Sequence, residues 1–275
     1  MAIDLLNEIN IFDLSAYTPI RFKKKNIGWL NNKTILNNSF NICNDYIEHS
    51  QLDAFIKILE KSESSTETCP VFLFPSLKPK KVFSESAKFC KKNIFIIKRN
   101  LLSLFGLPSY GVHCNVWRKH KDKFVIYFAK RSEKLKSFPG YIDNTVAGGQ
   151  PINLSIFENL KKEAYEEAGI SCKYLKKVQR GNIVSYFHNN NNNFISAVIF
   201  NYHLNKVDEL KLKNIDGEVE SFFSLPLENI YKLLEKNLLK PNCIIPILDF
   251  ILLNDYHFLS KGTIVEIKKI LRLDE

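Results

Sequence analysis

The sequence predicts an α+β protein whose larger part is a mixed β-sheet packed between helices. Strand-like runs dominate from Tyr110 onward, one amphipathic helix interrupts them at Ser155–Gly169, and two helical runs follow the last strand. This order of strands, helix, strands and helices is typical of an α/β/α sandwich with a mixed sheet. The 275 residues are enough for this sandwich and for a smaller α+β domain before it.

The N-terminal part is expected to be this smaller domain. Its expected elements are a helix, two short strands and a final helical segment, at Gln51–Leu59, Val71–Phe74, Asn93–Ile97 and Leu101–Phe105. The last segment ends at Gly106-Leu107-Pro108, where we place the domain boundary. We therefore expect an N-terminal domain over residues 1–108, with a lid or substrate-recognition role, and a second domain over residues 109–275.

The second domain is expected to contain two hairpins, a further strand and two helices. The expected strands are Val112–Trp117, Lys123–Ala129, Val184–Phe187, Phe194–Tyr202 and Glu218–Phe223. The tract Asn189–Asn193 is expected to be a flexible loop in the second hairpin. Leu227–Glu235 and Ile244–Leu253 are expected to be helices, and the second is nearly all apolar, which predicts that it is buried.

The composition is that of a globular protein, with 45% hydrophobic and 25% charged residues. No stretch approaches 18 uncharged apolar residues, so no transmembrane helix is expected. The N-terminus, with Asp4 and Glu8, lacks the basic region of a signal peptide. The six cysteines are scattered without a C-x-x-C pair, which favours reduced thiols over a zinc site. We therefore expect a cytoplasmic protein without a membrane partner.

The net charge of +10 allows two interpretations. It could attract phosphorylated ligands or nucleic acid, or it could be the solvated surface of a sequence rich in Lys and Asn. We favour the second interpretation, because net charge bears on steering and solubility rather than on a particular site.

The most informative element is the acidic helix. Ser155 and Glu158 form an S-x-x-E capping box, and Gly169 stands where a left-handed residue would end the helix. Carboxylates at i, i+3 and i+4 share one face, namely Glu163, Glu166 and Glu167. Like charges at this spacing weaken a helix by roughly a few tenths of a kcal/mol per pair, and a hard cation such as Mg²⁺ or Mn²⁺ would remove that cost. The alternative is an ordinary solvated acidic face.

The segment before the helix favours a site over a plain acidic surface. Gly148-Gly149-Gln150-Pro151 cannot continue a helix and is expected to be a tight loop. A loop of this kind brings the backbone close to an anionic ligand, and the helix N-terminus adds favourable partial charge. The expected order is therefore strand, glycine loop and acidic helix.

Gly148–Ile170 resembles the Nudix hydrolase box, G-x5-E-x7-R-E-U-x-E-E-x-G-U, in which U is aliphatic. Lys162 stands at the position of the Arg, and Glu163 begins the Glu series. Two positions depart from the pattern: its first Glu falls on Leu154, and Ala164 is a small version of the aliphatic residue.

Further motifs resemble one branch of this family, the Nudix proteins related to thiamine pyrophosphokinase, which carry an extra N-terminal domain and lack the first Glu. The matching segments are Phe105–Asn115, Phe138–Gly149, Asp216–Phe222 and Lys240–Asn242. They occur in the family's order within residues 99–255, which makes the resemblance more specific than one motif alone.

The resemblance implies a set of site residues. The metal ligands would be Glu163, Glu166 and Glu167, and Glu163 or Glu167 could instead accept a proton from water. Lys162 would orient a Glu or contact phosphate, and the alternative is a plain surface lysine. Glu218 or Glu220 would be an extra ligand or the general base, and the alternative is a solvent-facing sheet edge. Gly148, Gly149, His113, Asn115 and Asn242 would contact the substrate, although for His113 we favour a satisfied core histidine.

The resemblance also implies an activity, which is hydrolysis of a small organic diphosphate to a monophosphate with Mg²⁺ or Mn²⁺ as cofactor. Thiamine diphosphate or its damaged analogues is the expected substrate. A nucleotide sugar or a dinucleotide is the alternative substrate. The alternative without catalysis is a basic protein that binds RNA or a partner, and the intact Glu series argues against it. We therefore expect a small-molecule partner rather than nucleic acid.

Overall fold

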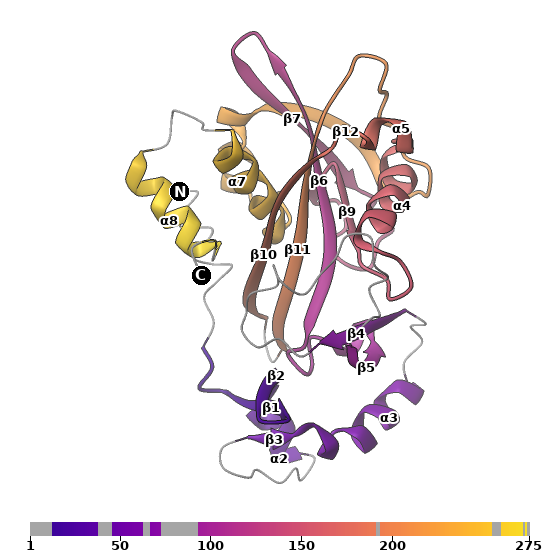
Figure 1. Ribbon diagram of the computed structural model, residues 1–275, viewed down its shortest axis with the longest axis vertical. Coiled ribbons are helices and arrows are strands. Elements are labelled where there is room, and N and C mark those ends of the chain that lie inside the picture. The colour runs from indigo at the N-terminus through magenta and orange to yellow at the C-terminus, as the bar shows by residue number, and fades with distance from the viewer. Residues whose placement is uncertain are drawn as a thin grey trace.

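The protein consists of a seven-stranded mixed sheet with helices on both faces and a smaller group of strands and helices that precedes it in sequence (Figure 1). The computed structural model describes residues 13–37, 46–62, 67–72, 93–190, 193–254, 260–271 and 273. This arrangement confirms the predicted α+β class and the sandwich with a mixed sheet.

The large sheet has the strand order β10-β11-β6-β7-β12, with β8 beside β7 and β9 beside β6. Its strands are β6 (Pro108–His120), β7 (Lys123–Arg131), β8 (Ile142–Asn144), β9 (Val146–Gly149), β10 (Gln179–Asn190), β11 (Asn193–Asn205) and β12 (Val219–Pro226). The β6 and β11 strands pair in parallel, whereas the other pairs are antiparallel. Both predicted hairpins are therefore confirmed, with longer strands than expected.

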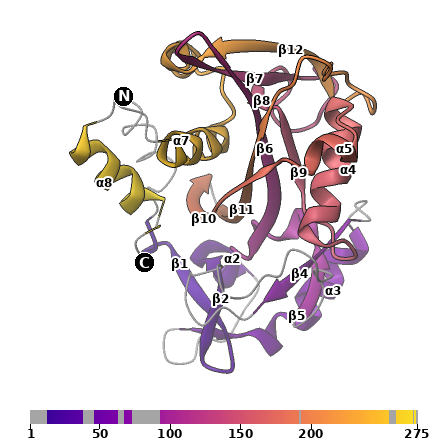
Figure 2. The same ribbon diagram turned by 45° about the horizontal axis from the view of Figure 1, so that its top comes forward.

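Helices cover the two faces of this sheet (Figure 2). One face carries α4 (Ile156–Ala168) and α5 (Cys172–Leu175), and the other carries α7 (Ile244–Leu253). Between β12 and α7 lie α6 (Tyr231–Glu235) and 3-10 turns at Leu227–Asn229 and Pro241–Cys243, and α8 (Lys261–Ile270) follows α7.

Alternation along β6 divides its side chains between the two faces. Val112, Cys114 and Val116 belong to the apolar cluster under α4, whereas Asn115 donates a hydrogen bond from Nδ2 to the Pro246 carbonyl of α7 at 2.8 Å. The α7 helix itself is buried along nearly its whole length, as its apolar sequence predicts. Each fully buried Ile or Leu side chain contributes about 1.5–3 kcal/mol, so this helix anchors its face of the sheet.

The N-terminal segment builds a separate apolar cluster. Its elements are β1 (Tyr17–Phe22), β2 (Lys25–Asn31), α2 (Asn32–Asn37), β3 (Ile47–Glu48), α3 (Asp53–Ser62), β4 (Thr68–Phe72), β5 (Asn93–Lys98) and 3-10 turns at His49–Gln51 and Arg99–Leu101. The cluster extends from Ile20 to Leu107, and β6 begins at Pro108. It meets the large sheet where the Phe194 amide donates to the Ser103 carbonyl at 3.2 Å. The division into domains at residue 108 stays a prediction.

Some expected elements differ from the structure. Leu101–Phe105 is wrong as a helix: it is the end of a 3-10 turn followed by turns, and Gly106 ends the segment in the left-handed conformation at φ 54°. The asparagine loop is shorter than expected, since pairing continues to Asn190 and Asn193. The expected Leu227–Glu235 helix is divided into a 3-10 turn and α6. Residues 73 and 74 of one expected strand lie outside the described residues.

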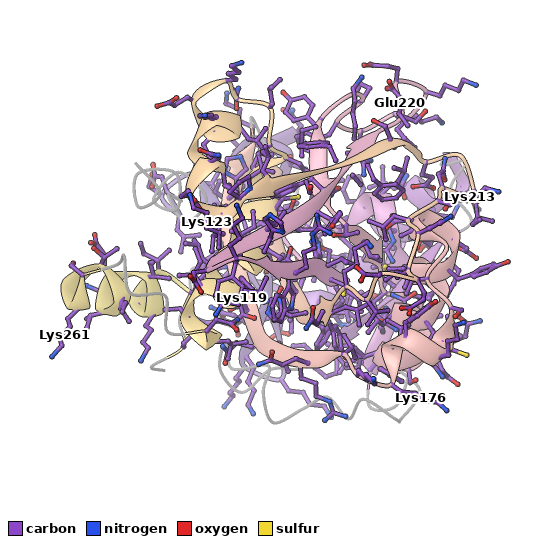
Figure 3. The ribbon with its side chains drawn as sticks, turned by 90° about the horizontal axis from the view of Figure 1, so that it is seen from above. Lys119, Lys123, Lys176, Lys213, Glu220 and Lys261 are labelled. Atoms are coloured by element: carbon purple, nitrogen blue, oxygen red, sulfur yellow. The ribbon has the colours of Figure 1, made fainter. Side chains whose placement is uncertain are left out.

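The positive charge is spread over the surface. Figure 3 labels exposed lysines on separate elements, at Lys119, Lys123, Lys176, Lys213 and Lys261. This spread agrees with a solvated surface. In the part of the chain that the structure describes, no helix is both long enough and apolar enough to cross a membrane.

Candidate functional site

The helix α4 begins and ends where the sequence predicts. The Glu158 amide donates to Ser155 Oγ at 3.2 Å and the Ser155 amide donates to Glu158 Oε2 at 2.8 Å, which completes the capping box. Gly169 ends the helix in the left-handed conformation with φ 66°. Ala164 and Ala168 are fully buried on the inner face of α4. Glu163 and Glu167, which precede them, lie along β9.

The two glycines before the helix form part of β9, so the predicted tight loop is wrong for them, and the loop begins at Gln150. Gly148 and Gly149 pair with Val112 and Gly111 of β6. Their lack of a side chain serves close approach rather than a turn: a Cβ on Gly148 would lie 2.2 Å from Glu163 Cδ, and a Cβ on Gly149 would lie 2.7 Å from the Arg99 guanidinium carbon. Local sequence suggests a turn here because it does not reveal what lies above the strand.

Lys162 joins two of the carboxylates. Its Nζ lies 3.1 Å from Glu163 Oε1 and 2.7 Å from Glu166 Oε2. Burial acts to lower the Lys162 pKa, but the hydrogen bond to Glu166 and the charge of Glu163 outweigh it and raise the pKa. Burial also raises the pKa of Glu163, against the opposing charge of Lys162. The structure thus contains one cation that relieves the repulsion between Glu163 and Glu166.

Glu167 has a different environment from these two residues. It is buried, and its Oε2 accepts a hydrogen bond from the Ala147 amide of β9 at 2.7 Å. Within the described residues, no Lys or Arg lies at ion-pairing distance from it. Burial raises the Glu167 pKa to about 8, and the charges of Asp143 and Glu163 add to the rise, while the Ala147 hydrogen bond opposes it.

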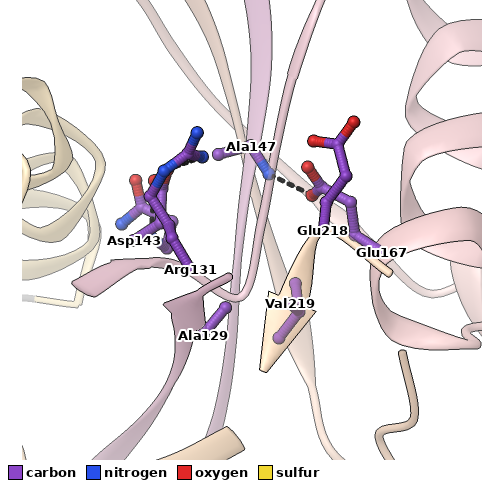
Figure 4. A pocket seen from close by; sticks show the side chains of 8 residues that line it. Ala129, Arg131, Asp143, Ala147, Glu167, Glu218 and Val219 are labelled. Atoms are coloured by element: carbon purple, nitrogen blue, oxygen red, sulfur yellow. Dashed lines mark hydrogen bonds and ion pairs between the residues drawn. The ribbon is translucent and has the colours of Figure 1, made fainter. Parts of the chain in front are cut away.

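A small hollow that opens to solvent lies beside Glu167. Figure 4 shows Glu167 and Glu218 on one side of it and Arg131 and Asp143 on the other. Glu218 precedes β12 in a loop that two hydrogen bonds hold in place. Its amide donates to Asp216 Oδ1 at 2.9 Å, and its carbonyl accepts from the Ser132 amide at 2.8 Å. Glu220 instead pairs with Lys130 at 2.9 Å across an irregularity in the strand pairing.

Asp143 is the centre of a paired group on the far side of this hollow. Its Oδ2 accepts from Arg131 Nη1 at 3.1 Å and from Lys240 Nζ at 2.8 Å, and its Oδ1 accepts from Cys243 Sγ at 2.6 Å. Burial acts to raise the Asp143 pKa, but the Lys240 charge and these hydrogen bonds hold it at about 2. The same pairing outweighs burial at Lys240 and raises its pKa.

Two groups of side chains offer metal ligands. His113, Asp143 and Cys243 present ligand atoms within 4.8 Å of one another, a set that zinc accepts. Four donors already occupy Asp143, two of them cations, and burial raises the Cys243 pKa well above its usual range, so the thiol stays protonated. This group does not fit a metal. Glu163, Glu167 and Glu218 carry the hard oxygen ligands that Mg²⁺ and Mn²⁺ prefer, and Glu163 lies near enough to the other two for their charges to interact, but among the described residues these oxygens are not gathered as closely as the first group's ligand atoms.

His113 and Asn115 lie in a polar network on the α7 face. His113 Nδ1 meets Asn144 Oδ1 at 2.7 Å, and Asn144 Nδ2 donates to Asn115 Oδ1 at 2.9 Å. Burial lowers the His113 pKa to about 4, so the ring is neutral. Asn242 lies in the turn before α7, half-buried and close to Tyr186. Contact of these three predicted residues with substrate stays a prediction.

Known proteins resemble a large part of this chain. It is 35% identical over 158 residues to Nudix hydrolase 20 and 34% identical over 158 residues to Nudix hydrolase 24, both chloroplastic proteins of Arabidopsis thaliana. Each alignment covers 57% of this chain, and 42% and 43% of the two relatives. These similarities support the Nudix hydrolase family. The chain spans less than half the length of these curated relatives, and no protein-family model matches it.

Solved Nudix structures resemble the chain at lower identity. The Nudix domain of Shewanella oneidensis NrtR in complex with ADP ribose has a TM-score of 0.42 and 13% identity, over 53% of this chain and 88% of that one. The Ap4A hydrolase of C. elegans has a TM-score of 0.41 and 14% identity, over 54% of this chain and 98% of that one. The thiamine pyrophosphokinase-related branch stays a prediction.

Sequence analysis of the Nudix-like site missed Arg99, Arg131, Asp143 and Lys240. Asp143 and Lys240 stand in motifs quoted for the family resemblance, but nothing in their spacing shows that they meet. They are 97 residues apart, and Arg131 is 12 residues from Asp143. A charged residue between apolar neighbours, as Lys240 stands between Leu239 and Pro241, is the one local signal that a buried pair is present.

Proposed function

We propose that this chain hydrolyses a diphosphate linkage in a small organic diphosphate with the help of a divalent cation. One observation carries the proposal: Glu167 is a buried carboxylate at the edge of a solvent-open hollow, and no Lys or Arg among the described residues lies at ion-pairing distance from it. Burying an unpaired carboxylate is unfavourable, so a residue that contributed only to stability would have a partner. Glu167 has acidic neighbours instead, which favours a site built for a positive ion.

The side chains that would hold the ion are Glu163, Glu167 and Glu218. When bound, Mg²⁺ or Mn²⁺ would supply positive charge to the phosphoryl oxygens. The chain fixes these ligands in advance: the Ala147 amide orients Glu167, and Gly148 leaves the space that Glu163 occupies. Lys162 holds Glu163 and Glu166, and its remaining donor capacity faces outward to meet phosphate.

The reaction is addition of water to one phosphorus and cleavage of the bridging P–O bond, with transfer of the water proton to a carboxylate. Glu218, where it does not bind the ion, is suited to accept this proton, because it is exposed, lines the hollow and stands on a loop held by hydrogen bonds. Glu163 and Glu167 remain alternatives for this role. For thiamine diphosphate the products would be thiamine monophosphate and phosphate.

The finer proposal is that the organic group carries an aromatic ring, as thiamine diphosphate and its oxidised analogues do. It rests on the motif resemblance and on Phe138 and Tyr141, whose rings pack edge to face at 5.4 Å in the loop before β8. Phe138 is 42% exposed in a left-handed backbone conformation, and its carbonyl accepts from Arg131 Nε at 3.1 Å. Arg131 also lines the hollow, so this loop borders the site and offers a surface on which a planar ring can stack.

A substrate panel tests both levels of the proposal. The metal-free protein is incubated with thiamine diphosphate, its oxidised analogues, an alkyl diphosphate, a nucleotide sugar and a dinucleoside polyphosphate, each with Mg²⁺ or Mn²⁺. Mass spectrometry identifies the products, and Glu220→Gln serves as a control because Glu220 pairs with Lys130 outside the hollow.

We expect cation-dependent release of a monophosphate, fastest from the ring-bearing diphosphates. Preference for the nucleotide compounds would overturn the finer proposal and support the alternative substrates. No hydrolysis of any compound would overturn the proposed activity. Tight RNA binding with a steep salt dependence and no hydrolysis would support the non-catalytic alternative.

A further inference from the structure

Three consecutive residues of β9 meet side chains from two parts of the protein, α4 and the N-terminal segment. The Ala147 amide donates to Glu167 Oε2 at 2.7 Å. The Glu163 side chain fills the space that a Cβ on Gly148 would need. The Arg99 guanidinium fills the corresponding space above Gly149. The position of this short strand therefore sets the position of two proposed metal ligands, and Arg99 contacts the same strand from the N-terminal segment.

Arg99 is held at both ends. It follows β5, and its backbone amide donates to the Glu67 carbonyl at 2.9 Å. Its Nε lies 2.8 Å from Glu67 Oε1, and its Nη2 donates to the Gln150 carbonyl at 3.0 Å. The planar guanidinium can cover Gly149, reach Gln150 and face Glu67 at once because its nitrogens form a rigid fork. A lysine ammonium has no such fork.

The C-terminal end of β9 is also held from the other side. Asn159 of α4 donates from Nδ2 to the Gly149 carbonyl at 3.0 Å, and the Gln150 amide donates to the Tyr110 carbonyl at 2.8 Å. The strand end thus lies between α4 and Arg99. Loss of Arg99 would leave only contacts from the large sheet and α4, and Gly149 has no side chain of its own to resist displacement.

We propose that Arg99 is a positioning residue through which the N-terminal segment fixes β9, and with it Glu163 and Glu167. This inference rests on the proposed function. It gives the N-terminal segment a role as a fixed brace on the carboxylate site. A displacement of a catalytic group by about 1 Å can cost about 10²-fold in rate, so a brace at this strand controls turnover without touching substrate.

The test compares Arg99→Ala and Arg99→Lys with Arg21→Ala in the full-length protein. Arg21 is a matched control, because it also lies in the N-terminal segment but bonds to Asn26 at 2.9 Å and covers Tyr46. The measurements are kcat, KM, the Mn²⁺ concentration for half-maximal rate, and amide hydrogen exchange over residues 146–150 with and without Mn²⁺.

Both Arg99 variants are expected to lose about 10- to 100-fold in kcat and to need several-fold more Mn²⁺, with KM within about threefold of the wild type. Added guanidinium should restore part of the rate in Arg99→Ala but not in Arg99→Lys, where the side chain occupies the space. Exchange over residues 146–150 should rise in both variants and stay unchanged in Arg21→Ala. If Arg99→Ala does not fold, Arg99→Lys carries the test.

Unchanged kcat and exchange in the Arg99 variants would overturn the inference, and so would equal losses in Arg21→Ala. The exchange measurement separates this inference from the proposed function. If the wild type hydrolyses no diphosphate, the proposed activity is wrong, but faster exchange over residues 146–150 in the Arg99 variants would still show that Arg99 fixes the strand.

Discussion

Asp143 and Glu167 are two buried carboxylates on opposite sides of one hollow, and their surroundings differ in one respect. Asp143 has two cations and a thiol as partners, and its pKa is held at about 2. Glu167 has a single backbone amide, and its pKa is raised to about 8. Burial alone would raise both pKa values, so the pairing decides the direction. Among the described residues Asp143 has cations within ion-pairing distance and Glu167 has none, and under the proposed function a bound ion would supply that charge.

The largest effect is expected for Glu167→Gln. Removing the charge should lower kcat by about 10³-fold or more, because the variant loses a ligand for the ion that neutralises the phosphoryl oxygens. Steady-state kinetics on the best substrate of the panel measures this, with Glu220→Gln as the matched control. Without metal near pH 7 the variant should unfold at a higher temperature than the wild type, since the wild type must take up a proton to bury Glu167, whose pKa is raised to about 8, and the variant need not. Full activity in Glu167→Gln would show that the metal assignment is wrong.

On the Asp143 side of the hollow, substitution is expected to lower stability rather than raise it. Asp143→Asn should lower the free energy of unfolding by about 3–5 kcal/mol, because it leaves Arg131 and Lys240 buried without their shared anion. Urea denaturation measures the loss, and the exposed Asp122→Asn is the control. A destabilisation no larger than that of the control would contradict the assignment of Asp143 as the centre of a paired cluster.

This contrast also shows what the sequence could reveal. The ends of α4 were predictable because a capping box and a terminal glycine are local signals. Gly148 and Gly149 were misread because their neighbours in space, Glu163 and Arg99, are distant in sequence. The brace and the paired cluster depend on such non-local contacts, and no local pattern encodes them. The Glu series was visible because helical spacing places its members on one face, but only the fold shows that Glu167 differs from the other two.

The pH dependence of stability should separate the two sides further. Between pH 6.5 and 8 the folded protein keeps the proton on Glu167, whose pKa is about 8, while the unfolded chain has lost it. The folded state binds more protons there, so its stability falls as pH rises, by about 2 kcal/mol over this window. His113, whose pKa is lowered to about 4, is neutral in the folded state, whereas the unfolded chain still protonates it partly near pH 6.5, so it adds only a small slope of the opposite sign.

Denaturation in EDTA at several pH values measures this slope. Glu167→Gln should remove it, and Mg²⁺ or Mn²⁺ should flatten it in the wild type by favouring the charged carboxylate. An equal dependence of stability on pH in the wild type and the variant would mean that a group other than Glu167 titrates in this window.

The smallest effect is expected for Phe138 in the loop before β8, which contacts Arg131 on the Asp143 side of the hollow. Phe138→Ala should raise KM for a ring-bearing diphosphate about 5- to 10-fold, or about 1 kcal/mol, and leave kcat within about twofold, because the ring contributes stacking that is equal in ground and transition states. An alkyl diphosphate should show no change in KM, and Leu36→Ala, an exposed apolar residue of α2, controls for loss of surface area. Equal increases for both substrates would mean that Phe138 supports the loop rather than the ring. In that case the Asp143 side would contribute only rigidity, and recognition of the organic group would lie elsewhere.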